Sequence, residues 1–213
     1  MSEMAVYALG FVAQGFFSAR TIIQWVRSER ARRIESPTVY WLCSIAGAWL
    51  LFVYGWLRDD FSIILGQIIS YYVYLWNIGA KGLWRMVPAV LRMVLLFTPC
   101  LAVVMIFRDV RGFAAEFLHN GSVPMWLLLF GSVGQVLFTL RFIYQWLYSR
   151  RRGSSSLPLG FWIMSLVGSA IIVTYGAIRL DPILILGQAI GLVAYSRNII
   201  IGLRTLKVVR NAE

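Results

Sequence analysis

The chain contains twice a strongly apolar stretch in which one arginine lies at a fixed spacing from two glutamines. The first copy, residues 10–28, reads Gly-x3-Gln-x5-Arg-x3-Gln-Trp-x2-Ser, and residues 131–149 repeat it 121 positions later without a gap. On a helix, where each residue turns by about 100°, the polar residues of a copy fall within an arc of roughly 120°. A narrow polar stripe on an apolar helix must face protein or water, so we predict that this stripe is the functional centre.

Arg20 and Arg141 are the side chains of the stripe with the most specific chemistry. A guanidinium offers a planar fork of donors that matches the oxygens of a phosphate or pyrophosphate. One interpretation is therefore a clamp for the phosphate of a lipid carrier or glycolipid. The other is snorkelling, in which the stem lies in apolar surroundings and the guanidinium reaches the headgroups. The cost of burying two such residues does not decide between them.

A second polar set lies in the third apolar segment of each copy, where a Gln, a Tyr and an Asn fall on an arc of about 80°. These side chains could bond neighbouring helices, at roughly 0.6–2 kcal/mol each, or bind a sugar hydroxyl or headgroup. The predicted substrate-binding residues are Gln14, Arg20, Gln24, Gln67, Tyr74, Asn77, Gln135, Arg141, Gln145, Gln188, Tyr195 and Asn198.

Each copy also carries an Arg-x-Asp triplet before its third segment. The plain interpretation is helix capping with a local ion pair; the alternative is an outer gate that makes and breaks a salt bridge. The candidate gate residues are Arg58, Asp60, Arg179 and Asp181.

The apolar segments hold no set of residues typical of an active site. They contain no Ser-His-Asp set and no carboxylate pair, and the two cysteines have no metal-ligand spacing. We therefore predict no catalytic residue, no metal and no cofactor, and we predict that the chain is not an enzyme.

Composition indicates what holds these side chains in place. The chain is 60% hydrophobic and only 14% charged, whereas roughly a quarter of the residues of a soluble domain are charged. We predict an all-α polytopic membrane protein, because most of its apolar segments are long enough for a bilayer that takes roughly 20 helical residues. The seven segments are about 4–26, 38–57, 61–80, 87–107, 124–147, 159–178 and 182–202.

The internal repeat groups these segments. Each repeat, about 10–81 and 131–202, holds three helices, and the extra helix between them restores the orientation that an odd number of spans would invert. The prediction is seven transmembrane helices in a 3+1+3 arrangement with two parallel repeats. The predicted domains are residues 1–82, a linker helix and outer loop at 83–121, and residues 122–213.

The chain has a net charge of +11, and its basic residues are unevenly distributed between the predicted inner and outer regions. With the amino terminus outside, 13 Lys and Arg residues fall in inner regions and 4 in outer regions. This bias predicts an outer amino terminus and a cytoplasmic carboxyl terminus. Topology and anionic headgroups account for most of the basic residues, so we predict no nucleic-acid partner. Four tryptophans flank the inner loops and are expected at the membrane interface, namely Trp25, Trp41, Trp146 and Trp162.

The combined motifs resemble a known family. After the opening stretch come Pro-x3-Trp-x2-Ser-x2-Gly, Tyr-Gly-x2-Arg-x-Asp, Gly-Gln and Tyr-x2-Asn in both repeats. The pattern resembles the lipid-A-disaccharide synthase N-terminal domain family of bacterial membrane proteins, which is similar in layout to the PQ-loop transporters, including SWEET and SemiSWEET proteins. No Pro-Gln dipeptide occurs here. In PQ-loop transporters an Asn of the third helix contacts substrate, which implies this role for Asn77 and Asn198.

The resemblance implies a place in the lipid A and cell-envelope glycolipid pathway. The expected function is an inner-membrane transporter or flippase, whose partner is a membrane lipid or lipid-linked sugar with a sugar or phosphate headgroup. Because members of the family are fused to a soluble glycosyltransferase, the alternative is a non-transporting membrane subunit that docks such an enzyme through basic inner loops.

Overall fold

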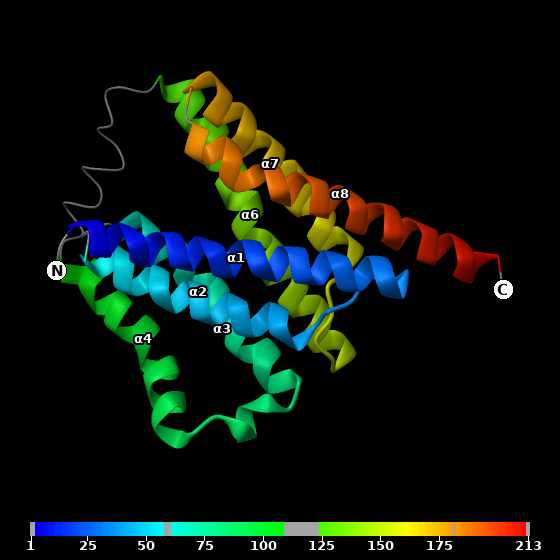
Figure 1. The fold of residues 1–213 in the computed structure, drawn as a ribbon, viewed down its shortest axis with the longest axis horizontal. Helices are drawn as coiled ribbons and strands as arrows, with labels where there is room; N and C mark the ends of the chain where they lie inside the picture. Colours follow the sequence, from blue (N-terminus) through cyan, green and yellow to red (C-terminus); the bar gives the residue numbers. More distant parts are fainter. Residues whose placement is uncertain (1–2, 58–60, 109–123, 181, 212–213) are drawn as a thin grey trace. The chain divides into compact units, whose positions relative to one another are not determined.

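The computed structural model describes residues 3–57, 61–108, 124–180 and 182–211. These ranges contain seven α-helices, one short 3-10 helix and no strand, so the all-α prediction is confirmed for them (Figure 1). The helices are α1 (Glu3–Ala31), α2 (Thr38–Leu57), α3 (Phe61–Ala80), η1 (Leu83–Met86), α4 (Ala89–Arg108), α6 (Met125–Arg152), α7 (Leu159–Ile178) and α8 (Pro182–Arg210).

Each of the seven predicted segments corresponds to one of these α-helices, but α1, α6 and α8 continue past the predicted ends. The prediction followed apolar residues and stopped where Arg and Lys begin. Arg and Lys are good helix formers, so the backbone hydrogen bonds continue through the basic residues. The end of α8 extends beyond α6 and α7 (Figure 1).

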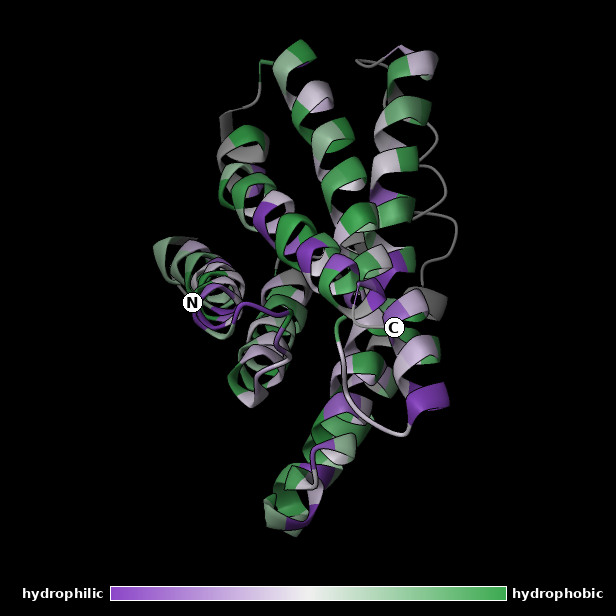
Figure 2. Ribbon diagram, turned by 90° about the vertical axis from the view of Figure 1, so that its right-hand side faces the viewer, coloured by the Kyte–Doolittle hydropathy of each residue, from purple (hydrophilic) through white to green (hydrophobic). Residues whose placement is uncertain are grey.

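Membrane character is evident in the length and composition of the helices. Three of the described helices are long and apolar enough to cross a membrane, within Met4–Ala31, Met125–Arg152 and Leu159–Ile178. Shorter apolar stretches lie at Thr38–Tyr54 and Ala89–Cys100, and hydrophobic residues recur along all the helices (Figure 2). The full 3+1+3 transmembrane arrangement stays a prediction.

The chain divides into two compact units. The first consists of Met1–Phe17 and Trp41–Val123, and the second of Ser18–Tyr40 and Pro124–Glu213. In the second unit α6, α7 and α8 lie side by side (Figure 1) and are joined by the second half of α1. The predicted domains follow the sequence repeat, and their boundaries stay a prediction.

The first two helices of each repeat pack in the same way. A Cβ atom added at Gly10 would lie 3.1 Å from the Tyr54 ring, and one added at Gly131 would lie 2.8 Å from the Tyr175 ring. These positions are equivalent in the two copies. Glycine therefore permits the close approach of the two helices in both repeats.

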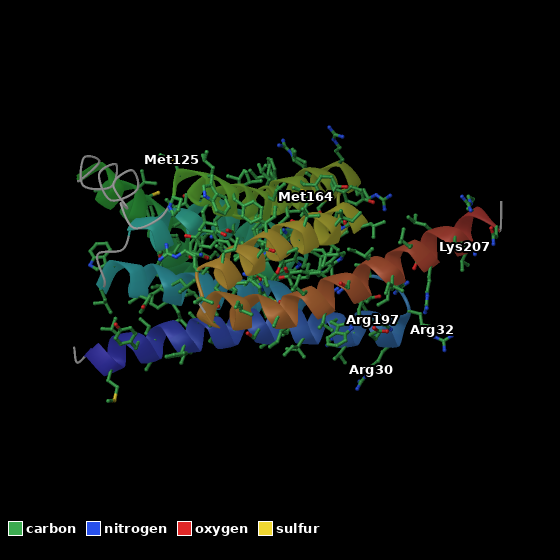
Figure 3. The ribbon with its side chains drawn as sticks, turned by 90° about the horizontal axis from the view of Figure 1, so that it is seen from above. Arg30, Arg32, Met125, Met164, Arg197 and Lys207 are labelled. Atoms are coloured by element: carbon green, nitrogen blue, oxygen red, sulfur yellow. The ribbon has the colours of Figure 1, made fainter. Side chains whose placement is uncertain are left out.

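The turns that end α1 and α6 are also equivalent but use different residues. Gly153 ends α6 with φ of 67°, and its N–H donates to the Arg150 carbonyl at 3.3 Å. The equivalent residue after α1 is Arg32, with φ of 51° and an N–H bond to the Glu29 carbonyl at 3.3 Å. A left-handed backbone is unfavourable for any residue with a Cβ atom. The Arg32 side chain points away from the ribbon (Figure 3).

We expect Arg32→Gly to stabilise the protein by about 0.5–1 kcal/mol. The change relieves the strain of the left-handed backbone, and this gain exceeds the cost of the higher entropy that glycine gives the unfolded chain. Gly153→Ala is the matched reverse change and should destabilise by a similar amount. Thermal unfolding in detergent, followed by circular dichroism, measures both. Equal Tm values for all three proteins would contradict this account of the turns.

Candidate functional site

Arg141 on α6 is the centre of the second unit, and its side chain is only 2% exposed. Its Nη1 atom donates to the Ser165 hydroxyl of α7 at 3.0 Å and, at the longer distance of 3.5 Å, to the Tyr195 hydroxyl of α8. The guanidinium of an α6 residue is thereby bonded to both α7 and α8.

Aromatic rings surround this guanidinium. The Arg141 Cζ atom lies 3.4 Å from the centroid of the Phe138 ring, 4.7 Å from that of Phe142 and 5.3 Å from that of Phe161. Ring faces attract a cation by about 0.5–2 kcal/mol. They do not supply a counter-charge, and a buried charge without one is strongly unfavourable.

No acidic side chain of the described residues pairs with Arg141. The two ion pairs found there join Arg33 to Glu35 and Arg197 to Glu29. In addition, the buried Nε–H of Arg141 donates to no acceptor within the described ranges. The guanidinium therefore retains both charge and hydrogen-bonding capacity for an anionic oxygen.

Arg20, on the second half of α1, lies against the same aromatic cluster. Its side chain is 7% exposed, and its Cζ atom lies 5.3 Å from the Tyr40 ring centroid and 5.7 Å from that of Phe142. Phe142 is thus contacted by both arginines. The burial of both side chains within the protein argues against snorkelling.

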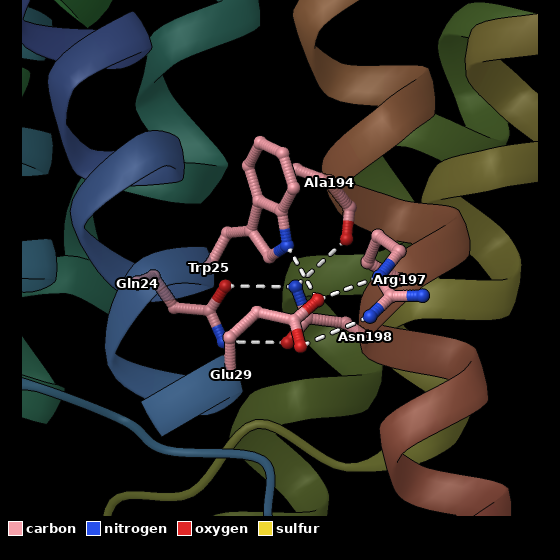
Figure 4. A network of polar contacts seen from close by, with 6 residues as sticks. All are labelled: Gln24, Trp25, Glu29, Ala194, Arg197 and Asn198. Atoms are coloured by element: carbon pink, nitrogen blue, oxygen red, sulfur yellow. Dashed lines mark hydrogen bonds and ion pairs between the residues drawn. The ribbon is translucent and has the colours of Figure 1, made fainter. Parts of the chain in front are cut away.

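The predicted residues Gln24 and Asn198 bind each other. The Gln24 Nε2 donates to Asn198 Oδ1 at 2.8 Å, and the Asn198 Nδ2 donates back to Gln24 Oε1 at 2.9 Å (Figure 4). The same Asn198 amide also donates to the Ala194 carbonyl at 2.8 Å. Each amide has two donors and one acceptor oxygen, so this pair has little capacity left for a substrate. The pair therefore fits the interpretation that these side chains bond neighbouring helices.

Gln24 has a further structural role at the connection between α1 and α2. Its Nε2 lies 2.8 Å from the Ser28 hydroxyl and 3.2 Å from the Glu35 carbonyl, and the Glu35 N–H donates to the Ser28 hydroxyl at 3.0 Å. The side chains thus satisfy backbone groups beyond the helix end.

Gln145 holds the connection between α6 and α7 in the same manner. Its Nε2 donates to the Ser149 hydroxyl at 2.9 Å and the Ser156 carbonyl at 2.8 Å, and the Ser156 N–H donates to Ser149 at 3.1 Å. The repeated Gln-Trp-x2-Ser motif is therefore a connection clamp, by which we mean Gln24 with Ser28 and Gln145 with Ser149.

The remaining predicted residues occupy varied surroundings. Gln14 and Gln135 are exposed, whereas Gln67 and Gln188 are half-buried. Gln188 accepts a bond from the Ser169 hydroxyl at 2.8 Å. None of these four side chains is hydrogen-bonded to Arg141 within the described residues.

Tyr74 and Asn77 of α3 are buried in the first unit. The Tyr74 ring lies 6.2 Å from that of Trp41, and the Asn77 Nδ2 donates to the Val73 carbonyl at 2.8 Å. Their proposed role in binding substrate stays a prediction.

Three of the four gate residues, Arg58, Asp60 and Asp181, lie outside the described residues. Arg179 is exposed at the end of α7. The gate therefore stays a prediction. No cluster of His, Cys, Asp or Glu suited to a metal ion occurs within the described part of the chain.

The sequence analysis missed an ion pair between α1 and α8. Arg197 contacts both carboxylate oxygens of Glu29, at 2.6 and 3.1 Å, and the Trp25 indole N–H donates to Glu29 at 3.0 Å (Figure 4). The equivalent positions in the other copy hold Arg150 and Trp76. This difference between the two repeats was the feature of the sequence that could have indicated the ion pair.

Two of the four tryptophans expected at the membrane interface do not face it, whereas the other two, Trp25 and Trp146, are half-buried. Trp41 is 0% exposed and Trp162 is 1% exposed, so both belong to the protein interior. Trp162 packs edge-on against Phe161 with 4.9 Å between ring centroids. Their large rings fill the packed interior in preference to the interface.

Two relatives illustrate what this chain is similar to in sequence. The chain is 28% identical over 192 residues to a protein named lipid-A-disaccharide synthase from Chlamydia pneumoniae, a match that covers 88% of this chain and 32% of the relative. A protein of the same name from Chlamydia felis (strain Fe/C-56) is 25% identical over 205 residues, with coverages of 92% and 33%. The chain thus spans about a third of the length of these relatives. No solved structure matches.

These relatives correct one prediction. They are named for an enzyme, so the prediction that the chain is not an enzyme is wrong by this comparison. The likeness to PQ-loop transporters stays a prediction.

A family match covers both repeats. The family described as Lipid A Biosynthesis N-terminal domain matches residues 9–79 and again residues 130–200. These two matches account for more than half of the chain, and they coincide with the predicted repeats. The chain belongs to the Lipid A Biosynthesis N-terminal domain family.

Proposed function

We propose that this chain is a bacterial inner-membrane protein of lipid A biosynthesis that binds a lipid with a sugar or phosphate headgroup and carries the headgroup across the membrane. Family membership and the names of the relatives support the pathway. The same names favour a lipid A precursor as the bound lipid.

The observation that carries the proposal is the buried Arg141 guanidinium, which has an unused Nε–H and no acidic partner among the described residues. Arg20 adds a second positive charge at the shared Phe142 ring. A lipid headgroup loses its hydrogen bonds to water inside a bilayer, where unsatisfied polar groups cost several kcal/mol each. Fixed guanidinium donors would replace part of that hydration.

A second candidate is a membrane subunit that docks a glycosyltransferase. It is favoured by the exposed basic residues at the ends of α1 and α6, namely Arg30, Arg33, Arg150, Arg151 and Arg152. Anionic headgroups account for the same charges, and docking gives no role to the buried Arg141. We therefore place lipid transport first.

The proposal includes an outer amino terminus and a cytoplasmic carboxyl terminus. In a background of Cys43→Ala and Cys100→Ala, we expect Ser2→Cys to react with an impermeant maleimide in intact cells. Asn211→Cys should react only after permeabilisation, because the 13-to-4 bias of Lys and Arg retains that end inside. Labelling of Asn211→Cys in intact cells would contradict the orientation.

We expect Arg141→Gln to weaken the binding of phosphatidic acid, used as a phosphate-bearing probe, by about tenfold or more, because a charge-assisted hydrogen bond contributes about 1.5–3 kcal/mol. Arg141→Lys should also impair binding, since Lys lacks the planar fork. Titration of the purified protein in detergent measures affinity, and transfer of a fluorescent derivative between vesicle leaflets measures transport.

Arg204→Gln is the matched control, because Arg204 is exposed on α8 and the substitution removes the same charge. It should bind and transport like the wild type. Circular dichroism separates lost binding from lost folding. Full binding and transport by a well-folded Arg20→Gln/Arg141→Gln double variant would refute the proposed function.

A further inference from the structure

Trp162 of α7 has an unused donor beside the candidate site. The indole is 1% exposed, and its Nε1–H donates to no acceptor of the described residues. Its ring lies 4.9 Å from that of Phe161 and 5.9 Å from that of Tyr195, measured between centroids. Both of those rings also lie within 5.7 Å of the Arg141 Cζ atom.

Two buried donors of one aromatic cluster are therefore without acceptors, the Arg141 Nε–H and the Trp162 Nε1–H. Buried donors are nearly always hydrogen-bonded in proteins, and those left unpaired destabilise the fold. Arg141 and Trp162 come from different helices, and each is more than nine-tenths buried. A ligand that supplies acceptor oxygens to both would account for the two together.

We infer that this site binds the phosphate group of the lipid and that Trp162 donates to it alongside Arg141. The inference rests on the proposed function and narrows its substrate class from sugar or phosphate headgroups to phosphate. It gives Trp162 a role in recognition that neither its motif nor its expected interfacial position suggested.

The chemistry of the donors selects the ligand. Arginine and indole N–H groups donate only and accept nothing. An ionised phosphate presents acceptor oxygens alone and also neutralises the Arg141 charge. A sugar hydroxyl brings its own donor, and the Ser165 oxygen already accepts from Arg141 while the Ser165 hydroxyl donates to the Phe161 carbonyl at 2.6 Å. The site therefore favours phosphate over hydroxyl groups.

The direct test is an NMR titration of the full chain in detergent micelles with 15N-labelled tryptophan. Phosphatidic acid with oleoyl chains is compared with two lipids that carry the same kind of chain. Monoglucosyl diacylglycerol presents a sugar in place of the phosphate, and oleate presents a carboxylate. We expect phosphatidic acid to bind most tightly and to shift the Trp162 indole proton downfield, as a new hydrogen bond does. The Trp126 indole, which is 60% exposed on α6, is the internal control and should not shift.

Trp162→Phe both assigns the signal and removes the donor, and we expect it to weaken phosphatidic acid binding by about tenfold. Trp126→Phe should bind normally. If Trp162→Phe does not fold, the shift of the wild-type Trp162 indole proton remains decisive.

The outcomes separate the two proposals. Binding of phosphatidic acid without any Trp162 shift, or equally tight binding of the glucoside or oleate, would overturn the inference while leaving lipid transport intact. Failure of the wild type to bind or transfer any of the three lipids would refute the proposed function itself.

Discussion

The buried charge of Arg141 is the constraint around which the second unit is arranged. Arginine side chains are charged at neutral pH, and a buried charge requires compensation. Ser165 and Tyr195 supply hydrogen bonds and the aromatic rings supply weaker attraction, but no carboxylate of the described residues meets the guanidinium. In the proposed function, an anionic headgroup would complete the compensation that the protein supplies only in part.

The internal repeat supplies a common scaffold, and departures from it carry specific roles. The connection clamp of Gln24 with Ser28 has an equivalent in Gln145 with Ser149, with nearly the same distances. The ion pair between Glu29 and Arg197 has no equivalent in sequence, since the corresponding residues are Arg150 and Trp76. Shared residues therefore hold the helix ends, and the shared residues Gln24 and Asn198 also join α1 to α8. The unshared Glu29 and Arg197 add an ion pair between the same two helices.

Much of the helical fold could be predicted because apolar runs of about 20 residues leave few alternatives. The repeat singled out Arg20 and Arg141 as equivalent residues, but their common neighbour Phe142 became evident only in the structure. The partner of Gln24 was not, because Asn198 lies 174 residues away and periodicity does not reveal such contacts. Trp162 was missed for a related reason, since residue type alone does not show whether a buried N–H finds an acceptor.

The most direct test of an anion site around Arg141 is native mass spectrometry of the protein purified in mild detergent. The account predicts that the wild type retains one phosphate-bearing lipid, and that this lipid is absent from a folded Arg141→Gln variant but present in Arg204→Gln. A wild type that retains no lipid, or the same lipid at equal occupancy in Arg141→Gln, would contradict the account.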